Sequence, residues 1–114
     1  MDKLQALERH FGYSSFRPGQ ETIVDALLSG KDVLAVMPTG AGKSLCFQLP
    51  ALLLGGLTLV ISPLISLMKD QVEGLAQNGI CAVCLHSQME EKQRQMAWEL
   101  LRQGRCRLLY IAPE

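Results

Sequence analysis

Apolar residues follow two spacings along the chain, and each spacing predicts a different element. In five segments they recur three or four residues apart, as in amphipathic helices; these segments are 2–11, 18–30, 43–54, 64–77 and 89–104. In four others they form short unbroken runs, which are typical of buried strands; these runs are 32–36, 57–61, 80–85 and 107–111. Two helices are therefore expected first, followed by alternating strands and helices.

Turn-forming and capping residues support this division of the chain. Helix stops are predicted at Gly12, Gly30, Asn78-Gly79 and Gly104, because these residues tolerate the left-handed conformation found at helix ends. Pro18 suits the first turn of the second helix. Ser87 and Glu90 have the spacing of a capping box for the fifth helix. Trp98, beside the apolar stripe of that helix, is expected to be partly buried.

The alternation of strands and helices predicts the α/β fold class. Buried strands separated by helices pair in parallel, so we expect a parallel sheet with helices on both faces, preceded by the two N-terminal helices. Right-handed crossovers then place the carboxyl ends of the strands at one edge of the sheet. Ligands bind at that edge in folds of this kind.

Composition is that of a globular domain, or a piece of one. The chain has 114 residues, 48% of them hydrophobic, and 11 Lys+Arg balance 11 Asp+Glu. This excludes a disordered chain, a strongly basic arm and a polybasic membrane patch. A neutral total still permits a locally basic groove that binds nucleic acid. An aromatic content of 5% argues against a surface covered with base-stacking rings.

The four cysteines are expected to be free thiols in a reducing, cytoplasmic setting, because no secretory signal precedes them. Cys81 and Cys84 have CxxC spacing, but no second pair accompanies them, so two residues of a buried strand are favoured over a zinc site. The uncharged stretch 44–68 is interrupted by Pro50, Gly55-Gly56 and Pro63. We therefore do not expect it to span a membrane.

The most informative segment is a glycine-containing loop between a predicted strand and a predicted helix. It reads Met37, Pro38, Thr39, Gly40, Ala41, Gly42, Lys43 and Ser44. Its glycines allow backbone amides to point at phosphate oxygens, and the helix dipole adds positive charge. Lys43 would reach the β- and γ-phosphates, and the Ser44 hydroxyl would bind Mg²⁺. The P-loop pattern fails at its first position, Met37, yet the strand–loop–helix placement favours a phosphate site over an incidental Gly-Lys-Ser.

Hydrolysis needs an acidic residue as well, normally after a second apolar strand. The run 57–61 is followed by Ser62-Pro63, and the run 107–111 by Ala112-Pro113-Glu114. Since Pro113 separates Glu114 from its strand, we expect the acid beyond residue 114 and regard Glu114 as the weaker candidate.

Three motifs together resemble the RecQ DNA helicases of superfamily two. They are Phe11-Gly12-Tyr13 with Phe16-Arg17-Pro18-Gly19-Gln20, the loop 37–46, and the segment 61–71. Residues 110–114 also fit the start of a later motif of that family. The resemblance covers essentially the whole chain; one departure is Ala41, where many members carry glycine.

For nucleotide binding, the resemblance implies an adenine site upstream of the loop. Gln20 would exchange two hydrogen bonds with the base, and Tyr13 and Arg17 would sandwich the ring. By residue type alone, Tyr13 could instead anchor a loop and Arg17 could be a solvated surface charge. The implied ligands are ATP and Mg²⁺, held by these residues and by the loop from Pro38 to Ser44.

The segment after the strand 57–61 resembles the motif that holds the backbone of single-stranded DNA. Its candidate residues are Ser62, Pro63, Leu64, Ser66 and Lys69. A strand end followed by a helix start offers amides and hydroxyls to a phosphate. Lys69 is equally well explained as an exposed helix charge.

The implied activity is ATP-dependent 3′-to-5′ translocation on single-stranded DNA with duplex unwinding, in recombination and repair. Residues 1–30 would form a helical adenine-recognition segment, and residues 31–114 the P-loop core of an incomplete RecA-like lobe. A second lobe would complete the ATP site. Two alternatives stay open: a nucleotide-binding module that does not hydrolyse ATP, and, less favoured, a small P-loop kinase.

Overall fold

The computed structural model describes residues 2–35 and 42–112. The chain divides into two compact units, Met1–Gly55 and Gly56–Glu114, and each is described here by itself. The predicted loop residues Pro38, Thr39, Gly40 and Ala41, and the weaker acid candidate Glu114, lie outside the described residues. Within the described ranges, no helix is long and apolar enough to cross a membrane.

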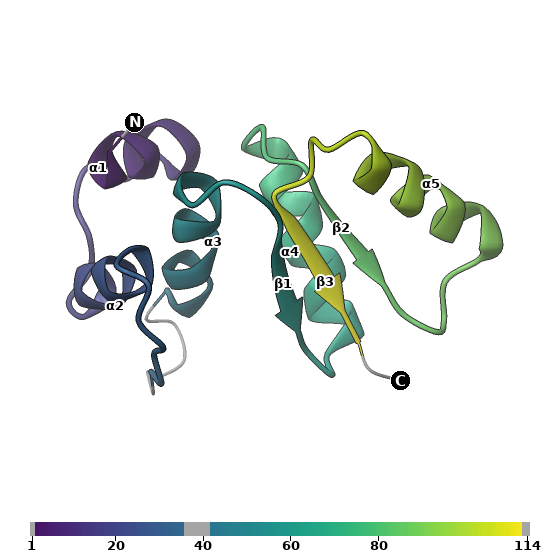
Figure 1. Cartoon of the computed structure of the whole chain (residues 1–114), viewed down its shortest axis with the longest axis horizontal. Helices are drawn as coiled ribbons and strands as arrows, with labels where there is room; N and C mark the ends of the chain where they lie inside the picture. Colours follow the sequence, from purple (N-terminus) through teal and green to yellow (C-terminus); the bar gives the residue numbers. More distant parts are fainter. Residues whose placement is uncertain (1, 36–41, 113–114) are drawn as a thin grey trace. The chain divides into compact units, whose positions relative to one another are not determined.

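The first unit is helical in its described part (Figure 1). Its elements are α1 (Lys3–Ala6), the π-helical turn η1 (Leu7–Phe11), α2 (Gln20–Leu28) and α3 (Lys43–Leu53). Asp2 begins α1 because its side chain accepts from Gln5 N at 2.8 Å, while Gln5 Oε1 accepts from Asp2 N at 3.0 Å. Gly12, with φ +76°, ends η1 as predicted. The predicted helix over 2–11 is thus confirmed, with a π turn as its second half.

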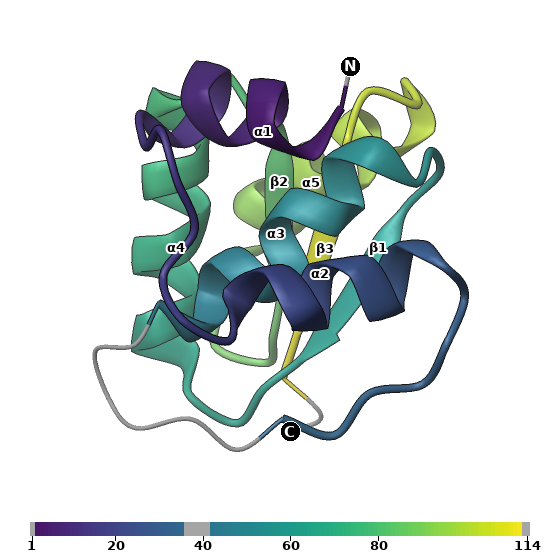
Figure 2. The same ribbon diagram turned by 90° about the vertical axis from the view of Figure 1, so that its left-hand side faces the viewer.

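The helices of this unit share one apolar core. The core residues are Ala6, Leu7, Val24, Leu45 and Leu49, and Phe11, Phe16, Leu28 and Leu53 pack against them. Figure 2 shows α3 lying beside both α1 and α2, in agreement with their contacts. At the surface, Lys3 Nζ on α1 pairs with Asp25 at 2.6 Å and Glu21 at 2.9 Å, both on α2. These pairs add a link between helices that the apolar core already holds.

Two predictions in this unit are wrong. Residues 32–35 of the predicted strand 32–36 are not in a strand, and Leu34 is 94% exposed. A strand forms only beside a pairing partner, and the described part of this unit contains helices alone. Pro18 lies in a turn before α2, since Gly19, with φ +87°, is the N-cap residue.

The second unit is a three-stranded parallel sheet with two helices (Figure 1). Its elements are β1 (Thr58–Ile61), α4 (Ile65–Gln77), β2 (Ala82–Leu85), α5 (Glu91–Arg102) and β3 (Leu108–Ile111). The strand order is β1-β3-β2, and Leu109 of β3 lies between Leu59 of β1 and Val83 of β2. The α/β fold class with parallel strands is confirmed.

The topology puts α4 and α5 on opposite faces of the sheet. The chain crosses from β1 to β2 through α4 and returns to the centre through α5, and right-handed crossovers in opposite directions use opposite faces. On the α5 face, Val83, Ala97, Cys106 and Leu109 form a buried cluster. Both helices contact β2. The prediction of helices on both faces is confirmed.

The structure corrects three predictions in this unit: the cap of α5, the burial of Trp98 and the burial of β1. The capping box of α5 uses Glu90 and Gln93 rather than Ser87 and Glu90, so the helix begins at Glu91. Ala97 is buried against the sheet while Trp98, one residue around the helix, is 47% exposed. The strand β1 lies at an edge of the sheet, so it is not buried on both faces as predicted.

Candidate nucleotide and DNA sites

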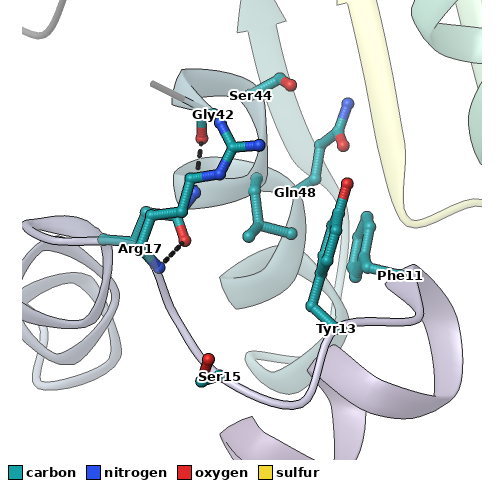
Figure 3. Close-up of a pocket in the computed structure, with 9 residues that line it drawn as sticks. Phe11, Tyr13, Ser15, Arg17, Gly42, Ser44 and Gln48 are labelled. Carbon is teal, nitrogen blue, oxygen red and sulfur yellow. Dashed lines mark hydrogen bonds between the residues drawn. The ribbon is translucent and has the colours of Figure 1, made fainter. Parts of the chain in front are cut away.

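A hollow of about 350 Å³ opens in the first unit, where the loop after η1 meets the start of α3 (Figure 3). Its volume is within the range of small-molecule sites. It is lined by Phe11, Tyr13, Ser15, Arg17, Gln20, Gly42, Ser44, Leu45 and Gln48. The hollow brings together the three residues predicted to hold adenine and the described end of the predicted phosphate loop.

The start of α3 has the form expected at the end of a phosphate loop. Gly42 is the N-cap residue and is left-handed, with φ +76° and ψ +39°. Since glycine has no side chain, the first amides of α3 receive no cap from this residue and suit an anion. Lys43 is the first helical residue and is exposed; Ser44, the second, is half-buried at the hollow.

Gln20 joins the two parts of the hollow. The side chain is 3% exposed. Its Oε1 accepts from Arg17 N at 2.8 Å, and its Nε2 donates to Gly42 O at 3.2 Å. A Cβ at position 42 would collide with Gln20 Nε2. Glycine suits position 42 for two reasons: the backbone there is left-handed, and the Gln20 amide lies where a Cβ would be.

Tyr13 and Arg17 are exposed members of the hollow, as is Ser15. Tyr13 is 53% exposed, as a ring that stacks on a ligand must be before binding. In the view of Figure 3, Arg17 lies at the left and the Tyr13 ring at the right, with the Gln48 side chain above Tyr13. This placement agrees with a ring held between the two side chains, which stays a prediction.

Four lining residues were missed by the sequence analysis: Phe11, Ser15, Leu45 and Gln48. The sequence pattern placed Phe11 in the apolar stripe of the first helix. Its side chain does pack on the core of this unit, and it lines the hollow as well. Gln48 carried a signal, because it is a polar residue inside an otherwise apolar helical stretch. At 7% exposure it is, with Gln20, one of the buried polar residues in the described part of the chain.

The candidate DNA segment belongs to the second unit and follows β1. Ser62 N donates to Ile111 O at 3.0 Å, which continues the sheet by one residue. Ser62 Oγ accepts from Leu64 N at 3.2 Å, so this amide, expected to face a phosphate, is already bonded within the turn. Pro63, Leu64, Ser66 and Lys69 are exposed. The segment thus presents an exposed helix start with a hydroxyl and an ammonium group.

The charge of Lys69 also reaches the sheet. Burial raises the pKa of the Cys84 thiol on β2, and the nearby Lys69 ammonium opposes that rise. Lys69 therefore sits close enough to the carboxyl end of β2 to act there electrostatically, as well as on any anion bound beside α4.

Comparison with known proteins identifies a family. Residues 17–114 match the family model described as DEAD/DEAH box helicase. The chain is 56% identical over 111 residues to "ATP-dependent DNA helicase RecQ" of Haemophilus influenzae, covering 97% of this chain and 18% of that protein. It is 51% identical to "ATP-dependent DNA helicase RecQ" of Synechocystis, covering 96% of this chain and 23% of that protein. It is 52% identical to human "ATP-dependent DNA helicase Q4", covering 96% of this chain and 9% of that protein.

The chain spans less than a quarter of the length of each of these relatives. The matched region includes the hollow residues Arg17, Gln20, Gly42 and Ser44 and the whole of the second unit. Tyr13 lies four residues before the family match begins. It belongs to the first of the three motifs by which the sequence resembles the RecQ helicases.

Proposed function

The chain belongs to the DEAD/DEAH box helicase family, and from this premise we propose that it supplies the ATP-binding end of an ATP-dependent DNA helicase. The observation that carries the proposal is the hollow in which Gln20 is bonded to both Arg17 and Gly42. One continuous wall therefore leads from residues suited to a base to the start of a helix suited to phosphates.

The residues present fit ATP by their chemistry. Tyr13 offers a π face and Arg17 a planar cation, and both can stack on a purine. A primary amide has two N–H donors and two acceptor lone pairs, so Gln20 can contact a base edge while both of its polar atoms hold protein groups. The first amides of α3 and the Lys43 ammonium would neutralise the negative phosphates.

A magnesium ion also fits the start of α3. The Ser44 hydroxyl is an oxygen ligand of the kind that Mg²⁺ accepts, and Ser44 lines the hollow. When bound, the ion would supply positive charge to the terminal phosphates. Lys43 and the helix amides would hold the same phosphates in place from the protein side.

For DNA, we propose that the start of α4 contacts the backbone of a single strand. Ser66 and Lys69 are exposed on the first turns of this helix, and such contacts tolerate any base sequence. Movement in the 3′-to-5′ direction, strand separation in recombination and repair, and closure of a second lobe over ATP belong to the same proposal, on the strength of the RecQ likeness.

The adenine assignment can be tested by substituting Gln20. Calorimetric binding of ATP and CTP to the chain is measured for Gln20→Ala and for the control Gln88→Ala, an exposed glutamine of the other unit. Loss of two base hydrogen bonds, at roughly 1 kcal/mol for each, should weaken ATP about thirtyfold, and CTP much less. Equal weakening of both nucleotides would mean that Gln20 only holds Gly42 in place and does not read the base.

A further inference from the structure

Two cysteines that lie far apart in the sequence have their sulfur atoms in contact. Cys81 Sγ and Cys106 Sγ are 3.0 Å apart, joined by an S–H hydrogen bond. Cys81 precedes β2 and Cys106 precedes β3, which are neighbouring strands of the sheet. We propose that Cys81 and Cys106 form a reversible disulfide, so that the second unit carries an oxidation site.

The backbone holds the two residues in a position that suits this bond. Arg107 N donates to Cys81 O at 2.9 Å, which extends the β2–β3 ladder to the residues just before the strands. Neighbouring strands lie about 4.8 Å apart. Cys81 lies opposite Arg107, so Cys106 is offset by one residue, about 3.3 Å along the strand, and a Cα separation of about 6 Å is expected. This is inside the range of about 4.4–6.8 Å that a disulfide requires. A bend at Arg107 brings Cys106 into the same apolar cluster as Cys81.

The CxxC pair suggested by the sequence cannot form this bond. Cys84 lies on β2 itself, three residues after Cys81 along an extended chain, which separates their Cα atoms by about 10 Å. Two cysteines more than about 7 Å apart cannot be bridged without moving the backbone. Cys81 therefore contacts Cys106 and not Cys84. Because Cys81 and Cys106 are 25 residues apart in the sequence, no short motif indicates this contact.

A small oxidant can reach the pair. Cys106 lies in the wall of a hollow of about 230 Å³ that is also lined by Gly56, Leu57, Leu101, Gly104 and Arg107. Cys81 is half-buried and Cys106 is 7% exposed. In the described part of the chain, no third His, Cys, Asp or Glu joins them in a group that could hold a metal ion. The two sulfur atoms are therefore placed for oxidation to a disulfide and not for metal binding.

The two thiols have different roles in the reaction. Burial, with the hydrogen bond that the Cys106 thiol makes to Cys81, raises the pKa of Cys106 to about 12, so this thiol stays protonated at neutral pH. A thiolate is the reactive form, so Cys81, the more exposed partner, attacks first. With hydrogen peroxide as the oxidant, the Cys81 sulfur takes one oxygen as the O–O bond breaks, giving a sulfenic acid and water.

The second step closes the bond. Cys106 sulfur attacks the Cys81 sulfenic sulfur, its proton leaves with the hydroxyl group as water, and the S–S bond forms. Two thiols are oxidised and one peroxide is reduced to two waters in all. The product would tie the entry of β2 to the entry of β3 and close a covalent loop that contains β2 and α5.

The test uses the chain with Cys46→Ser and Cys84→Ser, which leaves only the proposed pair among the four cysteines. The protein is treated with hydrogen peroxide, unreacted thiols are blocked with N-ethylmaleimide, and unreduced proteolytic peptides are analysed by mass spectrometry. We expect a Cys81–Cys106 peptide, loss of both free thiols, their return with dithiothreitol, and a rise in the thermal midpoint of the oxidised protein.

The unsubstituted chain gives the second measurement. Its free thiols, counted after unfolding, should fall from four to two, and Cys81→Ser or Cys106→Ala should abolish the fall. If Cys106→Ala does not fold, the Cys46→Ser and Cys84→Ser chain still decides. A Cys81–Cys84 linkage, cross-links between chains alone, or sulfinic acid at Cys81 with Cys106 unmodified would each overturn the proposal.

Discussion

Replacing Gly42 by alanine tests the close approach that joins the two ends of the nucleotide hollow. The added Cβ meets the Gln20 amide, and residue 42 has φ +76°. A left-handed backbone costs a non-glycine residue roughly 1–2 kcal/mol. The Gln20 amide ends a flexible side chain and can turn away, but it then loses its hydrogen bond to Gly42 O, which costs about 0.5–1.5 kcal/mol more. We therefore expect Gly42→Ala to reduce the free energy of unfolding by about 1.5–3.5 kcal/mol.

Gly12 provides a matched control in the same unit. It also has φ +76°, but a Cβ there would meet nothing within 4 Å. Gly12→Ala should carry the backbone cost alone, and its effect on the unfolded chain is the same as at position 42. The difference between the two variants, about 0.5–1.5 kcal/mol, then measures the displacement of the Gln20 amide.

The assay is urea unfolding followed by far-UV circular dichroism, with calorimetric ATP binding at the same protein concentration. In a Gln20→Ala background the collision partner is gone, so Gly42→Ala should cost no more than Gly12→Ala. ATP binding should weaken in Gly42→Ala and stay near normal in Gly12→Ala. Equal destabilisation of the two single variants would refute the close approach of Gln20 and Gly42.

Three lysines give further predictions, each compared with the control Lys92, an exposed residue of α5. Lys43→Ala should weaken ATP far more than adenosine in calorimetry, because we propose that its ammonium neutralises the phosphates; equal loss for both would contradict this. Lys69→Ala should weaken single-stranded DNA in fluorescence anisotropy and lower the salt slope by about 0.7; an unchanged slope would remove the phosphate contact. The hydrogen bonds that Lys3 donates to Asp25 and Glu21 raise the pKa of Lys3 above 10.5, so their stabilisation is present around neutral pH and is lost as the pH rises through the raised pKa. The difference in thermal midpoint between wild type and Lys3→Met should therefore shrink only above about pH 10.5; shrinkage near neutral pH would count against the pairs.

Elements with a strong local signal were predicted well from the sequence. The apolar stripe from Leu64 to Leu75 became α4, and Gly79 followed it with φ +78° as a helix stop. The runs at 57–61 and 107–111 became neighbouring parallel strands. Such elements are set by side-chain spacing and by backbone preferences, which short stretches of sequence contain in full.

The wrong predictions have both distant and local causes. The run 32–36 has strand composition, but its described residues have no strand beside them. Trp98 is exposed because Ala97, a small residue, makes the closer approach to the sheet. Glu90 caps α5 because Gln93, three residues later, reaches back to it; the capping pattern begins with Ser, Thr, Asp or Asn, so it selected Ser87 and not Glu90.

The candidate sites divide in the same way. The resemblance to the RecQ helicases was enough to select Tyr13, Arg17 and Gln20, and the structure has all three at one hollow with Gly42 and Ser44. It was not enough to find Phe11 or Gln48. Both line the hollow, although the sequence pattern placed them within helices. The pairing of Cys81 with Cys106 depends wholly on strand order, and no local pattern contains that information.

The central position of β3 has a consequence for how the second unit is made. The strands β1 and β2 both pair with β3, so within the sheet that the structure describes, the two strands synthesised first pair with no other strand until the last one arrives. A ribosome that has released residue 85 exposes two separate strands and the helix between them. The hydrogen bonds of the sheet form only when residues 108–111 emerge. The strand β3 then pairs with β1 and β2 together, because these two strands pair only with β3 and the loops that separate them from it in the sequence are long.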